Sequence, residues 1–121
     1  MSCWFRVNSF GGASANAILV SAESSGGFGA VLHTNENAGS PKIRIILSSN
    51  NSSFDITAGT LGTTTLSLNT WYKVRLVYDA LAGTYRVYLS NNGGAEVQEI
   101  SISSSAKICV INKIRLGRAA T

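Results

Sequence analysis

The stretch TWYKVRLVYDALAGTYRVYLSNNGG, residues 70–94, decides the fold. Two runs in which every second side chain is bulky and apolar, at 71–79 and 84–90, flank the short segment LAG. Because successive side chains of a strand point to opposite faces of a sheet, this pattern predicts a β-hairpin. The inward residues are expected to be Tyr72, Val74, Leu76, Tyr78, Tyr85, Val87 and Leu89, and the outward ones Trp71, Lys73, Arg75, Val77, Asp79, Arg86, Tyr88 and Ser90.

Segments of the same kind recur along the whole chain, separated by clusters of Gly, Ser and Asn. This spacing is typical of an all-β sandwich or barrel, and helix is expected to be nearly absent. We expect strands near residues 2–8, 17–22, 27–33, 42–48, 53–57, 64–68, 71–79, 84–90, 96–103 and 108–117. Outside the hairpin, the residues expected to face the core are Ile43, Ile45, Leu47, Ile114 and Leu116, opposite Lys42, Arg44, Lys113 and Arg115.

Length and charge bound the class of protein. A chain of 121 residues is long enough for one domain with one core. The net charge of +4 would attract anionic partners mildly, but the basic residues are spaced singly along the expected strands. We therefore expect no nucleic-acid binding, and the absence of an apolar run of about 20 residues argues against membrane insertion.

The two cysteines and the single histidine leave alternatives open. Cys3 and Cys109 are expected to be buried free thiols, and a disulfide between them, which would imply an oxidising compartment, is the alternative. His33, at the end of an expected strand, is expected to be a surface or capping residue rather than a catalyst.

The segments SCWFRVNSF (2–10), AILVSA (17–22), the hairpin and INKIRLGRAAT (111–121), in this order, resemble the laminin-G-like, concanavalin A-like jelly-roll domains. The resemblance implies an antiparallel two-sheet jelly-roll sandwich over residues 1–121, with sugars or protein partners on its concave face or rim. Such domains usually have a further strand before the first of these segments and a closing strand after the last. The resemblance therefore implies a domain that is part of a longer protein, or one completed by strands of a partner.

The carboxylates do not form the pattern of the glycosidases that share this fold. Glycosidases need acid and nucleophile on the same face about 5 Å apart, whereas Glu96 and Glu99, three residues apart, should point to opposite faces of a strand. We therefore expect no enzyme activity and no cofactor. Asp55, Asp79, Asn91 and Asn92 are candidate ligands for a weak Ca²⁺ site, but turn capping is the preferred role for them.

The outward aromatic and basic residues are the best candidates for binding. Aromatic rings stack on sugar faces, and guanidinium groups pair with carboxylate or phosphate. The alternative is a solvated sheet face that keeps the domain soluble. The candidate ligand-binding residues are Trp71, Lys73, Arg75, Arg86, Tyr88 and Arg44, within a larger outward set that adds Trp4, Arg6, Lys42, Lys113 and Arg115.

These features predict a non-catalytic recognition module that binds a glycan or anionic cell-surface polymer. We expect it to belong to an extracellular or virus-particle protein, such as a phage fibre or adhesin. One alternative is a structural domain of a virion or surface layer, which joins copies of itself or neighbouring subunits through open edge strands. Another is the ancillary domain of a carbohydrate-active enzyme.

Overall fold

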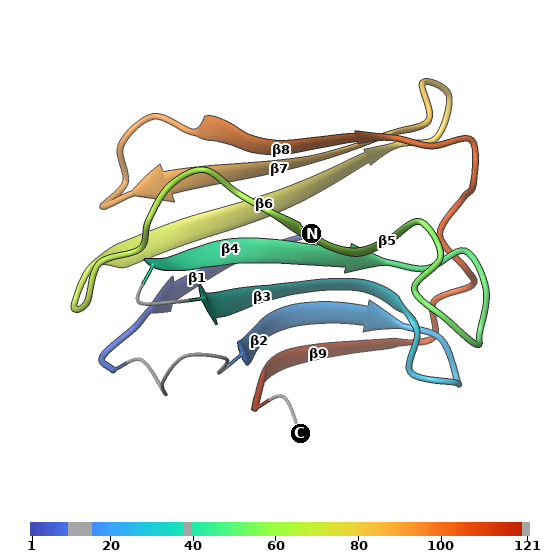
Figure 1. The fold of residues 1–121 in the computed structure, drawn as a ribbon, viewed down its shortest axis with the longest axis horizontal. Helices are drawn as coiled ribbons and strands as arrows, with labels where there is room; N and C mark the ends of the chain where they lie inside the picture. Colours follow the sequence, from blue (N-terminus) through green and yellow to red (C-terminus); the bar gives the residue numbers. More distant parts are fainter. Residues whose placement is uncertain (10–15, 38–39, 120–121) are drawn as a thin grey trace.

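The computed structural model describes residues 1–9, 16–37 and 40–119, which form two antiparallel β-sheets (Figure 1). The four-stranded sheet contains, in spatial order, β1 (Ser2–Arg6), β6 (Trp71–Asp79), β7 (Thr84–Asn91) and β8 (Val97–Ser103). The five-stranded sheet contains β5 (Thr57–Leu61), β4 (Ser40–Leu47), β3 (Gly29–Asn37), β2 (Asn16–Glu23) and β9 (Lys113–Ala119). The predicted all-β, two-sheet architecture is confirmed. The described part of the chain contains no helix that could cross a membrane.

The predicted hairpin is β6 and β7. Leu76 pairs with Val87, and Tyr78 with Tyr85, so that both runs of bulky side chains face the same side of the sheet. In the connecting turn, Gly83 has a φ of 62°, a left-handed conformation that glycine adopts without steric cost. The Asp79 carboxylate closes this turn by accepting hydrogen bonds of 3.0 Å from the backbone N–H groups of Leu81 and Ala82.

The core lies between the two sheets. The four-stranded sheet contributes Phe5, Tyr72, Val74, Leu76, Tyr85, Val87, Leu89 and Ile100, and the five-stranded sheet contributes Val20, Ala30, Leu32, Ile43, Ile45 and Leu47. Tyr78, half-buried, stacks on Tyr85 with ring centroids 4.5 Å apart. The predicted inward face of the hairpin is thus confirmed. Full burial of each large apolar side chain contributes about 1.5–3 kcal/mol to folding.

The predicted strands at 53–57 and 64–68 are wrong, and β5 lies between them. Side-chain hydrogen bonds to backbone explain why these segments are loops: the bond is local in the first segment and comes from a distant residue in the second. The Asp55 carboxylate accepts from the N–H of Ser49 at 2.8 Å, which holds the 49–55 segment in a compact turn. The Glu99 carboxylate accepts from the N–H groups of Thr63 and Thr64 at 2.7 and 2.8 Å. Similarly, the last strand begins at Lys113 rather than at 108.

Strand β9 lies at the border of the larger sheet, beyond β2 (Figure 1). Across the sandwich, β1 contacts β2 and β8 contacts β5, whereas β9 lies one strand beyond β2, at the border of the larger sheet. Ile114 and Leu116 lie on the same side as the core residue Val20, as expected, but they are 71% and 70% exposed. The prediction that they belong to the core is therefore wrong.

Candidate functional site

The outer surface of the four-stranded sheet carries most of the predicted binding residues. Residues directly opposite each other in an antiparallel pair share a face. Trp4 is opposite Lys73, Arg6 is opposite Trp71, Arg75 is opposite Tyr88, and Val77 is opposite Arg86. We call this set the aromatic–basic face; its members are Trp4, Arg6, Trp71, Lys73, Arg75, Arg86 and Tyr88. Five of the six predicted site residues belong to it.

The two tryptophans of the chain stand at one end of this face. Trp4 and Trp71 are 53% and 51% exposed, and together with Asn92 and Gly93 they line an open depression of about 520 Å³. Asn92 fixes this end, since its N–H donates to the carbonyl of Trp71 at 2.8 Å and its side-chain oxygen accepts from the Trp71 N–H at 3.3 Å. Two half-exposed indole rings beside a depression can take up an apolar sugar face.

Arg75 lies at the centre of the face, about 13 Å along β6 from Trp71. Its Cζ atom is 4.5 Å from the ring centroid of Tyr88, a cation–π contact. Its Nη2 and Nε donate to Glu96 Oε2 at 2.5 and 3.0 Å, and Lys73 Nζ lies 3.3 Å from Glu96 Oε1. The hydrogen bond with Arg75, and a weaker one with Lys73, lower the pKa of Glu96, so that it is ionised at neutral pH.

The charge of the face is positive. Glu96 compensates Arg75 and Lys73 with a single negative charge, while Arg6 donates to the uncharged side-chain oxygen of Asn69 at 3.2 Å. The Arg86 side chain is half-buried and makes no hydrogen bond or ion pair with another described residue. The face can therefore pair with anionic groups on a ligand as well as stack against its rings.

Arg44 does not belong to this face. It lies on β4 in the other sheet, opposite His33, and its Nη2 donates to the carbonyl of Ala58 at 2.8 Å. Lys42, Lys113 and Arg115 of the larger outward set lie on this same sheet. Arg44 is thus separated from the aromatic–basic face by the core. Arg44 and a residue of that face therefore cannot contact the same sugar ring of a ligand.

Glu96 is the residue that sequence reasoning missed as part of the face. The sequence pattern singles it out only as the possible partner of Glu99 in a catalytic pair. The sequence signal for its role is the pair of basic residues on the outward face of the hairpin, because Arg75 and Lys73 of β6 form ion pairs with Glu96. Glu99, in contrast, is buried and bound by Thr63 and Thr64, so the two carboxylates serve different partners.

The expectation that His33 is a surface or capping residue is wrong. It lies within β3, is 5% exposed, and its Nδ1 is 3.2 Å from the carbonyl oxygen of Thr34. Burial, and secondarily the positive charge of Arg44, lowers the pKa of His33 to about 4. The imidazole is therefore neutral at physiological pH.

The cysteines are free, as expected, but they are half-buried rather than buried. Burial raises the pKa of Cys3, which makes the unreactive thiol the dominant form. In the described residues no group of three or more His, Cys, Asp or Glu side chains could hold a metal ion. Asp79 caps its own turn and Asp55 binds Ser49 within its own loop, the capping roles that the sequence favoured.

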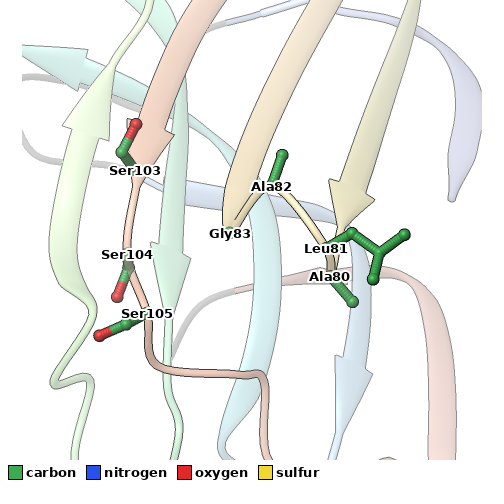
Figure 2. A pocket seen from close by; sticks show the side chains of 7 residues that line it. All are labelled: Ala80, Leu81, Ala82, Gly83, Ser103, Ser104 and Ser105. Atoms are coloured by element: carbon green, nitrogen blue, oxygen red, sulfur yellow. The ribbon is translucent and has the colours of Figure 1, made fainter.

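A second depression, of about 530 Å³, lies between the β6–β7 turn and the segment after β8 (Figure 2). It is lined by Ala80, Leu81, Ala82, Gly83, Ser103, Ser104 and Ser105. In the view of Figure 2 the hydroxyls of Ser104 and Ser105 point away from the turn. No charged or aromatic side chain lines this depression, so it offers a ligand little beyond backbone groups.

The two-sheet architecture and the sequence agree on the class of protein. The family model described as "Concanavalin A-like lectin/glucanases superfamily", a laminin G model, matches residues 1–121. The chain therefore belongs to this superfamily, and the sequence-based resemblance is confirmed. No curated protein and no solved structure gives a significant match.

Proposed function

We propose that this domain is a non-catalytic recognition module that binds a glycan or anionic surface polymer on its aromatic–basic face, as part of an extracellular or virus-particle protein. The observation that carries the proposal is the convergence of two half-exposed indoles, a Tyr-stacked Arg and unpaired cations on one face of one sheet. Membership of a superfamily that contains lectins supports it. The separate engagement of Glu96 and Glu99 supports a binding role over hydrolysis.

Glycan-array screening followed by titration calorimetry tests this proposal. Trp71→Ala and Tyr88→Ala should each weaken binding about tenfold or more, since large aromatic residues dominate binding energies. Leu81→Ala is the matched control, because Leu81 is a fully exposed apolar residue at a turn outside the face. Absence of binding to any glycan at millimolar concentration, or equal losses in the control, would count against the proposal.

A structural role, with assembly into a virion or surface layer, is the second candidate function. It is supported by the exposed apolar pair Ile114 and Leu116 on β9, the border strand of the larger sheet, and by β1, the border strand of the smaller sheet, which contacts β2, the neighbour of β9. Edge strands expose hydrogen-bonding groups with which another strand can pair. The occupant we favour is an extended strand of a neighbouring subunit, which would pair with β1 and cover Ile114 and Leu116. Assembly that buries more than about 1,000 Å² there would favour this role.

A further inference from the structure

The carboxylate of Glu96 occupies the centre of the aromatic–basic face. Glu96 lies just before β8, after the turn that contains Asn92 and Gly93. Its two oxygens accept from Arg75 Nε at 3.2 and 3.0 Å, and Oε2 also accepts from Arg75 Nη2 at 2.5 Å. Lys73 Nζ completes the arrangement at 3.3 Å from Oε1.

This arrangement is a carboxylate-binding site that the chain itself fills. Arg75 presents two nitrogens side by side to one carboxylate, the geometry by which a guanidinium recognises this group. The ring of Tyr88 lies under the guanidinium at 4.5 Å and leaves its hydrogen-bonding edge free for that contact. A uronic acid presents the same group on a sugar ring, and Trp71 and Trp4 lie on the same face to stack against adjoining rings.

The internal carboxylate can be displaced. The side chains of Lys73, Arg75 and Glu96 are 35%, 37% and 26% exposed, and ion pairs in such positions contribute little to stability. However, Glu96 is tethered beside Arg75, so its effective concentration is high and a single free carboxylate competes poorly. A polymer that also engages Arg86, Arg6 and the indoles has the further contacts needed to displace it.

We propose that Glu96 is a specificity-determining residue of this face. Its carboxylate occupies the subsite that a uronate carboxylate would take on Arg75 and Lys73, so that a carboxylated polysaccharide binds by displacing it. Glu96 thus weakens the binding of acidic ligands and sets how many further contacts they must make. This inference rests on the proposed function and names the ligand class, a uronate-containing polysaccharide.

The alternative role for Glu96 is to orient Arg75. In that case removal of the carboxylate would release Arg75 from Tyr88 and weaken the binding of acidic ligands. The two roles therefore predict opposite signs for the same substitution, Glu96→Gln. Asp79→Asn is the matched control, because it removes a negative charge from the same face of β6 while the amide oxygen can still cap the turn.

The test is calorimetric titration of the wild type, Glu96→Gln and Asp79→Asn with a galacturonate hexasaccharide and with its methyl ester, which has the same backbone without charge. Glu96→Gln should bind the acid roughly three- to tenfold more tightly, with a steeper salt dependence. Affinity for the ester, and both affinities of Asp79→Asn, should stay within about twofold of the wild type.

Three results would overturn the inference: a weaker or unchanged affinity of Glu96→Gln for the acid, an equal gain in Asp79→Asn, or no binding of the acid to either the wild type or Glu96→Gln. Failure of the proposed function is a separate result. It would appear as a wild type that binds no glycan on the array, whether neutral or acidic.

Discussion

The guanidinium of Arg75 lies between two partners, with the ring of Tyr88 4.5 Å from its Cζ atom and the carboxylate of Glu96 hydrogen-bonded to its edge. Each partner uses a different property of the side chain. The ring contacts its flat face, and the carboxylate contacts the N–H groups in its plane. This division explains how one sheet face can combine stacking with charge recognition.

Arg75→Lys should separate these two properties. Lysine keeps the positive charge but loses the planar fork, so affinity for an acidic glycan should fall by roughly three- to tenfold. Tyr88→Phe is the matched control, because it keeps the ring on which the guanidinium stacks. Calorimetry with the galacturonate hexasaccharide measures the affinities of Arg75→Lys and Tyr88→Phe. Equal affinities for wild type and Arg75→Lys would contradict a role for the bidentate geometry.

His33 should make the stability of the fold pH-dependent. Its pKa is about 4 in the folded state, below the value of 6.5 that applies to an exposed imidazole. The unfolded chain therefore binds a proton as the pH falls from 6.5 to 4, and the folded chain does not. The free energy of unfolding should drop by about 2 kcal/mol between pH 7 and pH 5.

Urea denaturation of wild type and His33→Gln at these two pH values measures this contribution. The variant, which has no group that titrates in this range at position 33, should lose most of the pH dependence. The same slope in both proteins would show that another group is responsible.

Glu99 should stabilise the 62–65 loop. Burial by itself would raise its pKa, but the hydrogen bonds from Thr64 and Thr63 outweigh that effect, and the pKa lies below the ordinary 4.5. This contribution to stability is present above pH 4.5 and is lost as the pH falls through the lower, folded-state pKa.

At neutral pH, Glu99→Gln should cost about 1–3 kcal/mol, because the charged hydrogen bonds that the buried Glu99 carboxylate accepts from Thr63 and Thr64 are lost. Glu96→Gln, which changes an exposed carboxylate, should leave the denaturation midpoint nearly unchanged. Equal midpoints for wild type and Glu99→Gln would contradict the structural role given to Glu99.

Ile45 and Ile114 test the burial pattern of the larger sheet. Both lie on the side that faces the smaller sheet, but Ile45 is fully buried and Ile114 is 71% exposed. Ile45→Ala should cost about 2–5 kcal/mol. Ile114→Ala should change the stability by no more than about 0.5 kcal/mol. Similar losses in the two variants, measured by chemical denaturation, would show that something covers β9 in solution.

The sequence predicted the parts of the fold that depend on local alternation. The hairpin was correct in strand position and in the orientation of Tyr72, Val74 and Leu89, because period-two patterns determine which face each side chain takes. The loops at 53–57 and 64–68 were mistaken for strands because Asp55 and Glu99 stabilise them through contacts that sequence periodicity does not reveal.

The errors in the predicted site concern how strands that are far apart in the sequence are arranged in the two sheets. Arg44 has the same alternation as Arg75, but β4 joins the other sheet, and strand order is not contained in the local pattern. Ile114 was assigned to the core because its neighbours alternate correctly, although its burial depends on a strand opposite β9. His33 is buried by its neighbours within the sheet, which no motif indicates.

The most direct test of the proposed glycan-binding face uses the only two tryptophans of the chain, Trp4 and Trp71. Both belong to the aromatic–basic face, so their indole N–H signals in an NMR titration report on it directly. Addition of a glycan that binds should shift both indole signals, together with backbone signals of Lys73, Arg75 and Tyr88. Binding that leaves both indole signals unchanged, and instead shifts Arg44 and its neighbours in the five-stranded sheet, would contradict the account.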